Sequence, residues 1–140
     1  MVRSYTDNLD RTITDNGTGL MWEKLTDDGT IHDKDNTYKC TQAFQKVADL
    51  NTENFAVHND WRLPNINELQ TLADYGTFNP AVSAAFNGGD SFTQSSVYWS
   101  STTNNAGNTS FAWVVGFNEG RVGTGNEANF NCVRAVRGGS

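Results

Sequence analysis

Two short β-prone runs stand close together near the start of the chain, in RTITDNGTGLMWEK at positions 11–24. The first run is rich in β-branched residues, and the second contains Met21 and Trp22. Asn16 and Gly17 lie between them. An Asn-Gly pair between such runs favours the tight turn of a β-hairpin. The pattern therefore predicts an N-terminal β-hairpin.

Apolar residues near helical spacing follow in CTQAFQKVADL, at positions 40–50. They are Ala43, Phe44, Val47, Ala48 and Leu50. This spacing predicts an amphipathic helix over about 41–50.

The stretch DWRLPNINELQTL, at positions 60–72, combines an extended entry with a helix start. Pro64 restricts Leu63 to an extended conformation, because the proline ring clashes with a helical preceding residue. Asn65 is a good N-cap, and Glu68 three residues later can bond back to it. The predicted apolar face of this helix consists of Ile66, Leu69, Leu72 and Ala73. Gly76 is placed to end the helix. We interpret this stretch as a structural joint, with Trp61 and Leu63 in the core.

The last third of the chain contains short β-prone runs separated by Gly- and Asn-rich turns. They are VYWSSTT, FAWVVGFNEGRVG and NCVRAVR, and they predict an antiparallel sheet that extends to the C-terminus. Because helices come early and strands late, the order predicts an α+β fold. The 140 residues show no repeat and no long linker, so we expect one domain over 1–140.

The formal net charge is -6, the pI is near 4.7, and the Lys and Arg residues are scattered singly. No basic stripe is present that could neutralise phosphates, so nucleic acid and anionic membrane surfaces are not expected partners. No apolar run reaches the roughly 18 residues of a membrane-spanning helix, so membrane insertion is not expected either. The start, MVRSYTDNLD, lacks the apolar core of a signal peptide.

No spacing in the chain indicates a catalytic site, and we expect no enzyme activity. Cys40 with His32 or His58 could form a nucleophile and base, but a buried thiol or a disulfide with Cys132 explains the cysteine equally well. The chain has no Cys-x-x-Cys pair, which is the usual sequence pattern of a zinc or redox site.

Two further motifs also have structural explanations. Asp60 and Glu68 could act as an acid/base pair, but a salt bridge from Asp60 to Arg62 and the cap role of Glu68 account for both. The pattern at 123–128 matches G-x-G-x-x-[GA], but the chain ends before the acidic residue that a dinucleotide site needs.

The segment 26–36 is an acidic loop, and its aspartates suggest calcium. They are Asp27, Asp28, Asp33 and Asp35. Counted from Asp33, the positions that hold Gly and Glu in an EF-hand hold Tyr38 and Phe44. We therefore expect a solvated acidic loop and no cofactor. A structural calcium ion in an irregular oxygen cage stays open, without support from a motif.

Four tryptophans could stack on sugars, but each lies within an apolar run. The core explanation is the stronger one for Trp22, Trp61 and Trp99. Trp113 stays open, because its neighbours alternate and its face is undetermined.

Several of these stretches, in the same order, resemble one prokaryotic family. They are TDNLDRTITDNGTGLMWEK, NDWRLPNINELQTL, YWSSTT, AWVVGFNEGRV and CVRAVR. The family is the one named for the C-terminal domain of the Legionella collagen-like adhesin, long catalogued as a domain of unknown function, and the likeness covers nearly the whole chain. The resemblance implies a C-type lectin-like fold, with two helices, an antiparallel sheet and an N-terminal hairpin. It also implies that residues 60–72 are scaffold.

The cysteines depart from the family pattern. The family usually has one near Val47 and one near Ala135, whereas this chain has Cys40 and Cys132. A bond between them would still tie the first helix to the last strand. The formylglycine-generating enzymes belong to the same fold branch, but their reactive cysteines have no counterpart here.

The segment 102–131 also resembles the variable region of proteins diversified by retroelements, which use C-type lectin-like domains. It is dense in Asn, Thr, Ser and Gly and holds seven of the 17 asparagines. An Asn-rich set of surface turns explains the same composition, and both interpretations stay open.

These resemblances predict a ligand-binding module with an adaptable polar surface, acting in attachment to a host or cell surface. The expected ligand is a protein or a glycan on a cell surface, and the expected location is extracellular, on a cell surface or on a virion. A homo-oligomer stays open. The expected site residues are Thr102, Thr103, Asn104, Asn105, Asn108, Ser110, Phe111, Trp113, Asn118, Glu119, Arg121, Asn126 and Asn129.

Two other functions are weighed beside this one. One is an adhesin with a fixed site for carbohydrate or glycosaminoglycan, and the acidic balance speaks against sulfated ligands. The other is an enzyme akin to the formylglycine-generating group, which predicts a copper- or thiol-dependent oxidation of a peptide.

Overall fold

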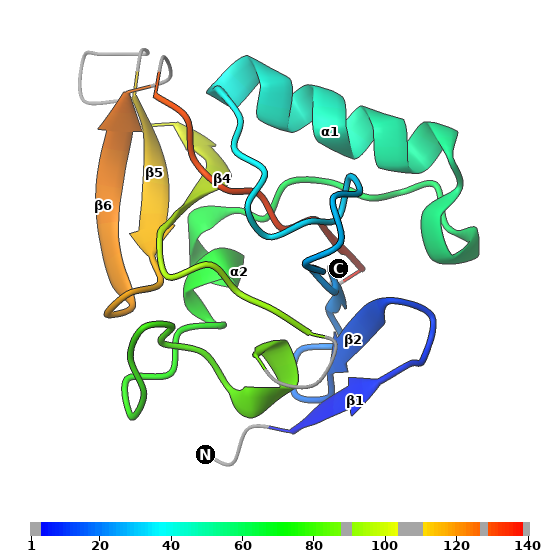
Figure 1. Ribbon diagram of the computed structural model, residues 1–140, viewed down its shortest axis with the longest axis horizontal. Coiled ribbons are helices and arrows are strands. Elements are labelled where there is room, and N and C mark those ends of the chain that lie inside the picture. Colours follow the sequence, from blue (N-terminus) through cyan, green and yellow to red (C-terminus); the bar gives the residue numbers. More distant parts are fainter. Residues whose placement is uncertain (1–3, 88–90, 104–110, 127–128, 139–140) are drawn as a thin grey trace.

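The computed structural model describes residues 4–87, 91–103, 111–126 and 129–138. The chain folds into two α-helices, short 3-10 turns and two antiparallel sheets, which confirms the predicted α+β class (Figure 1). The strands are β1 (Tyr5–Asp7), β2 (Thr12–Asp15), β3 (Met21–Glu23), β4 (Val97–Thr103), β5 (Phe111–Gly116), β6 (Arg121–Asn126) and β7 (Val136–Arg137). The helices are α1 (Cys40–Thr52) and α2 (Ile66–Gln70), and the 3-10 turns are η1 (Phe55–Val57) and η2 (Ala84–Phe86).

The predicted hairpin is strands β2 and β3 of a four-stranded sheet with the order β1-β2-β3-β7. Ile13 lies opposite Trp22, and both side chains are buried. Asn16 and Gly17 lie in the turn, as predicted. The Asp15 carboxylate accepts a hydrogen bond from the Gly17 amide at 2.9 Å, and this bond holds the turn in place.

The second sheet has the order β4-β5-β6, and β6 is one of its edges (Figure 1). The prediction that the last run, NCVRAVR, continues this sheet is wrong. Cys132 forms one parallel bridge with Tyr98, and the chain then crosses to the first sheet, where Val136 in β7 pairs with Trp22 in β3. The C-terminal segment therefore connects the two sheets.

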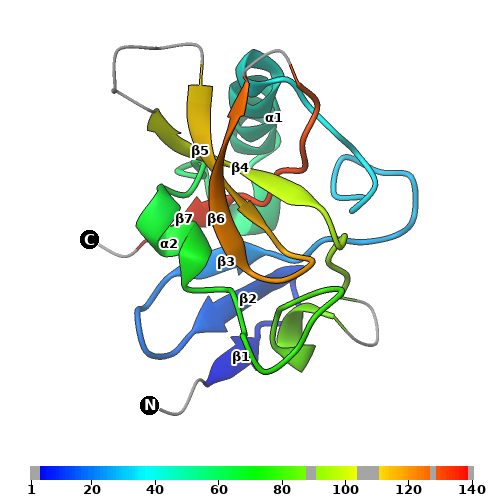
Figure 2. The ribbon, with the colours of Figure 1, turned by 90° about the vertical axis from the view of Figure 1, so that its left-hand side faces the viewer.

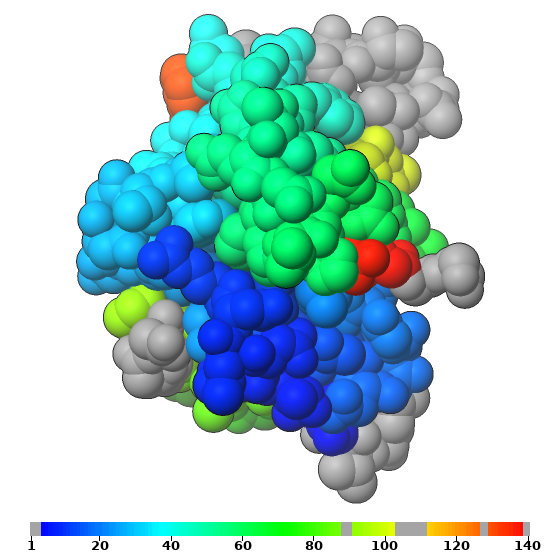
Figure 3. Space-filling model, turned by 90° about the vertical axis from the view of Figure 1, so that its right-hand side faces the viewer, coloured from blue at the N-terminus to red at the C-terminus, as the bar shows by residue number. Residues whose placement is uncertain are grey.

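Helix α1 confirms the first predicted helix, but not all of its apolar face. Phe44 is 52% exposed and Ala48 is exposed, whereas Lys46 is buried in their place. The reason is a buried carboxylate that pairs with Lys46, which the spacing of apolar residues cannot reveal. The acidic loop, the segment after α1 and the N-terminal strands lie side by side on one face of the molecule (Figure 3).

Helix α2 begins as predicted. The Asn65 side chain accepts from the Glu68 amide at 2.8 Å, and the Glu68 carboxylate accepts from the Asn65 amide at 2.9 Å. The helix ends at Gln70 rather than near Gly76, because Ala73 leaves helical geometry to pair with Val82.

The stretch 60–72 is a joint between distant parts of the chain. Trp61 and Leu63 are buried, as predicted, and the backbone of Arg62 pairs with that of Val136. The predicted salt bridge between Asp60 and Arg62 is wrong. Asp60 pairs with Arg137 at 2.6 Å, and Arg62 makes a two-bond contact with Glu68 at 2.6 and 2.7 Å.

The core consists of two clusters that share the second sheet. Tyr98 and Val115 belong to the cluster that contains Trp22 and Leu69, and Trp99 and Val114 belong to the one that contains Trp61 and Val47. Because successive side chains of a strand point to opposite faces, β4 and β5 contribute to both clusters. The sheet is therefore covered on both sides in its middle, and its ends and the β6 edge remain accessible.

Candidate functional site

The predicted site residues fall into three groups. Four of them, Asn104, Asn105, Asn108 and Ser110, lie outside the described residues. Thr103 is the last residue of β4, and Phe111 is the first residue of β5. The others lie along the β5–β6 hairpin or next to it.

Most described residues of the predicted site lie towards one or the other end of the β5–β6 hairpin, whereas Trp113 lies between the two ends (Figure 2). Asn126, opposite Phe111, lies at one end, and Arg121, opposite Gly116, lies at the other. The six-residue strands separate these ends by roughly 17 Å. Asn118 and Glu119 lie in the turn at the Arg121 end, so the predicted residues form two areas joined by the hairpin surface.

The surface of β6 alternates between glycines and side chains that face outward. Gly123 and Gly125 lie opposite Val114 and Ala112, on the face that packs towards α1. A Cβ at Gly125 would lie 3.2 Å from the Val114 side chain and 3.4 Å from the Trp99 ring. The residues that alternate with these glycines along β6, Val122 and Thr124, are exposed. We did not predict Val122 and Thr124, although the period of two in VGTGN indicates their common face.

Trp113 lies opposite Thr124 in the ladder and is half-buried. The other three tryptophans are at most 3% exposed, which confirms their core assignment. Trp113 is therefore the tryptophan that the β5–β6 surface can offer to a ligand. Thr102 has a structural task, because its hydroxyl accepts a hydrogen bond from the amide of Ile66 at 3.0 Å, at the start of α2.

The β5–β6 turn lies beside two exposed aromatic side chains that were not predicted as site residues. Tyr75 is 66% exposed and Phe78 is 75% exposed. A Cβ at Gly120 would lie 3.2 Å from the Tyr75 ring, so only a glycine allows this close approach. The Asn79 amide donates to the carbonyl of Asn118, which fixes the two loops together. Tyr75 and Phe78 thus add aromatic surface to the predicted polar residues at this end.

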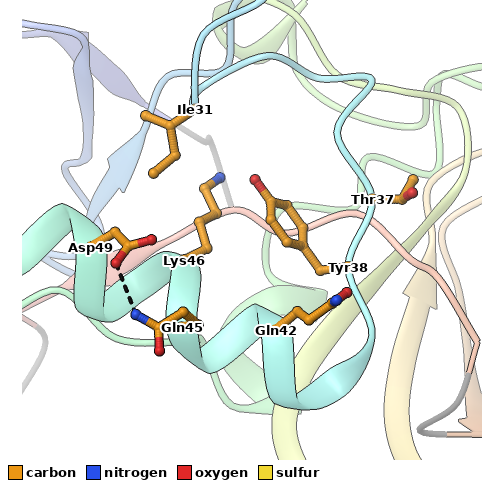
Figure 4. Close-up of a pocket in the computed structure, with 7 residues that line it drawn as sticks. All are labelled: Ile31, Thr37, Tyr38, Gln42, Gln45, Lys46 and Asp49. Atoms are coloured by element: carbon orange, nitrogen blue, oxygen red, sulfur yellow. Dashed lines mark hydrogen bonds between the residues drawn. The ribbon is translucent and has the colours of Figure 1, made fainter.

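A groove of about 390 Å³ lies between α1 and the end of the acidic loop (Figure 4). Its lining residues are Ile31, Thr37, Tyr38, Gln42, Gln45, Lys46 and Asp49. We had not predicted this site. A lysine in the middle of an amphipathic helix face is the only sequence signal that pointed to it.

Beneath this groove lies a cluster of buried charges centred on Glu23. The Glu23 carboxylate contacts Lys46 Nζ at 2.9 Å and His32 Nδ1 at 2.6 Å, and it accepts from the Ala135 amide at 3.0 Å. Burial opposes ionisation of Glu23, but Lys46 and His32 outweigh burial and lower the pKa of Glu23 to about 2. The carboxylate is therefore ionised at neutral pH, and every contact to it links a different segment of the chain.

Arg134 extends this cluster and is 2% exposed. Its guanidinium donates to the Glu23 carbonyl, the Phe92 carbonyl and the Thr93 hydroxyl, at 2.7 to 2.9 Å, and it stacks on the Phe86 ring. Glu23 and Arg134 are structural residues, because their hydrogen-bond partners are other groups of the protein.

The acidic loop is held by hydrogen bonds of its own. Asp27, Asp33 and Asp35 can bring one carboxylate oxygen each within 4.8 Å of one another. Backbone amides of Asp35 and Gly29 already donate to Asp33, and they lower the pKa of its carboxyl group. Asp28 bonds to Thr26 and Thr30 instead. These bonds account for Asp28 and Asp33 as parts of a folded loop.

The two cysteines are buried thiols and do not form a disulfide. Burial raises the pKa of the Cys132 thiol to about 11. A thiol of this kind is a poor nucleophile, because the thiolate is the reactive form. His32, the candidate base for Cys40, instead contacts Glu23 and packs against the Phe55 ring, with the two ring centroids 4.4 Å apart.

Within the described residues, no helix is long and apolar enough to cross a membrane. The family model of the Lcl C-terminal domain matches residues 11–137. No curated protein matches the chain.

Proposed function

Because the chain belongs to the Lcl C-terminal domain family, we propose that it is an adhesin-type surface module that binds its ligand through the β5–β6 surface. This surface comprises the outward side chains of the hairpin and the aromatic residues beside its turn. The expected partner is a protein or glycan on a cell surface, and such a module works outside the cell or on a virion. A C-type lectin-like fold is part of the proposal, and the α+β arrangement of two helices and antiparallel sheets supports it.

The alternation of glycine and exposed residues on β6 is the observation that carries the proposal. Gly123 and Gly125 face the core, whereas Val122 and Thr124 are exposed, so substitutions at these two positions change the surface more than the packing. Rigid scaffolds that carry changeable surface residues are typical of binding sites. We therefore also propose that the chain is a variable protein of a diversity-generating retroelement, with its variation in the segment 102–131.

A binding module is favoured over an enzyme by the chemistry of the buried groups. The raised pKa of Cys132 and the hydrogen bond between His32 and Glu23 speak against thiol-dependent oxidation. The exposed aromatic, amide and hydroxyl groups are those that binding surfaces use.

Sequencing the gene from many members of its source population tests this proposal. We expect substitutions at codons 113, 122, 124 and 126, with Gly123 and Gly125 constant, because only the first set faces outward. Codons 60–65 serve as the internal control and should be constant. A segment 102–131 as constant as residues 60–65 would show that the site is not diversified.

A fixed carbohydrate site is the second candidate function, and the groove beside α1 is the observation that favours it.

A further inference from the structure

The groove beside α1 has one polar wall, formed by the helix. Gln42, Gln45 and Asp49 lie three and four residues apart, so their side chains project from one helix face (Figure 4). Gln45 Nε2 donates to Asp49 Oδ1 at 2.9 Å, which orients both groups. Gln42 Oε1 accepts from the amide of Lys39 at 2.9 Å. The remaining capacity of these groups includes the Gln42 amide protons, Gln45 Oε1 and Asp49 Oδ2, so the wall offers donors and acceptors.

The opposite wall contains a fixed aromatic ring. The backbone of Tyr38 pairs with that of Asn131 through two hydrogen bonds of 2.8 and 2.9 Å. The ring is half-buried and lies 5.7 Å from the ammonium group of Lys46. Burial raises the pKa of the Tyr38 phenol to about 12, so the hydroxyl stays protonated and can donate. The ring is therefore held in place by contacts that do not depend on a ligand.

The floor of the groove is a buried lysine whose charge is already compensated. The Lys46 side chain is 1% exposed, and its ammonium group bonds to Glu23 Oε1 and to the carbonyl of Val133. Lys46 is the positively charged member of the lining, and Asp49 is the negatively charged one. Since Glu23 neutralises Lys46, the groove lacks the cation that a sulfate or carboxylate ligand requires.

We propose that this groove binds a neutral, hydroxyl-rich ligand, namely one unit of an uncharged saccharide. The Tyr38 ring offers an apolar face to the C–H groups of a sugar ring, and the amides and carboxylate offer partners to its hydroxyls. The volume of about 390 Å³ lies within the usual size of small-molecule sites. The inference rests on the adhesin-type role proposed above and names a ligand class, at a place separate from the β5–β6 surface.

Nuclear magnetic resonance titration of the ¹⁵N-labelled full chain tests the proposal. The probes are D-galactose, D-mannose and N-acetyl-D-glucosamine, with a sulfated heparin disaccharide as the charged comparison. We expect at least one neutral sugar to shift the signals of Tyr38, Gln42, Gln45 and Asp49 with millimolar affinity, and the sulfated disaccharide to leave them unchanged. If none of the neutral sugars shifts these signals, or if the sulfated one binds there more tightly, the proposal is wrong.

Two variants in the groove and two outside it separate binding from stability. Asp49→Ala and Gln45→Ala should each weaken binding of the neutral sugar roughly tenfold, since each removes a hydrogen bond. Gln70→Ala and Asn67→Ala, both on α2, should leave the affinity unchanged. All four positions are exposed, so the melting temperature should stay the same in each. Unchanged affinity in Asp49→Ala and Gln45→Ala would contradict the proposal.

The same titration distinguishes failure here from failure of the proposed function. If a neutral sugar shifts the signals of Trp113 and Thr124 rather than those of the groove residues, this inference is wrong and the β5–β6 surface remains the proposed binding site. If the signals of the groove residues shift and the sequence of the segment 102–131 is constant in the population, the fixed carbohydrate site is supported and the proposal of a diversified surface is wrong.

Discussion

Glu23 shows how much one residue can contribute to the arrangement of this protein. Its side chain is fully buried and contacts Lys46 from α1, His32 from the acidic loop and the backbone near Ala135. A buried ion pair contributes little to stability compared with apolar residues, but removal of one partner leaves a buried charge without compensation. Glu23 is therefore a residue that the fold depends on.

Glu23→Gln should lower the free energy of unfolding by about 3–5 kcal/mol, because it keeps the shape of the side chain and leaves Lys46 uncompensated. Urea denaturation followed by tryptophan fluorescence measures this change. The matched control is Glu119→Gln, which alters the exposed pair between Glu119 and Arg121 and should change stability by less than about 0.5 kcal/mol. Equal effects of the two variants would refute the structural role of Glu23.

At the scale of elements, β6 differs most from an ordinary strand. Its inward positions are glycines that lie over Val114 and Trp99, and its outward positions are exposed. The core of this sheet is therefore built by β4 and β5, and β6 contributes backbone pairing and surface.

Gly125→Leu should destabilise the protein by about 1–3 kcal/mol, because the new side chain overlaps Val114 and Trp99. The same residue placed one position earlier, in Thr124→Leu, points outward and should change stability by less than about 0.5 kcal/mol. Thermal or urea unfolding of both variants measures the difference. A similar loss in both would mean that the two faces of β6 are not distinct.

For the molecule as a whole, charged contacts that involve ionised carboxylates link the first sheet to α1, to the acidic loop and to the segment that leads into α2. Lys46 and His32 lower the pKa of Glu23 to about 2 against the opposing effect of burial, and Arg62 lowers the pKa of Glu68. Arg137 likewise lowers the pKa of Asp60. A lowered carboxyl pKa stabilises the fold above the ordinary pKa of the group.

The free energy of unfolding should therefore fall as the pH decreases below about 4.5 towards the lowered pKa of Glu23 near 2. Urea denaturation at a series of pH values from neutral to about 2 tests this dependence. Glu23→Gln should lose less stability over the same range, because it has no carboxyl group to protonate at that position. A wild-type stability that is flat or rising in acid would be inconsistent with these contacts.

The sequence alone predicted the features that depend on neighbouring residues. The hairpin at 11–24 follows from β-prone runs around Asn16-Gly17, and the start of α2 follows from Asn65 and Glu68. Three tryptophans were placed correctly in the core, because each lies in a run of apolar residues and such runs are usually buried on folding. These features need only a few consecutive residues and the physics of turns, caps and apolar burial.

Only the tertiary structure decided what depends on residues far apart in the chain. The end of α2, the pairing of Asp60 with Arg137 and the crossing of β7 to the first sheet each involve partners that sequence spacing cannot identify. For the candidate site, the sequence supplied the β5–β6 segment, but Tyr75 and the groove around Tyr38 emerged only once loops from other parts of the chain were placed beside it. The buried position of Lys46 has the same origin, since a lysine enters a core only where a carboxylate from a distant strand meets it.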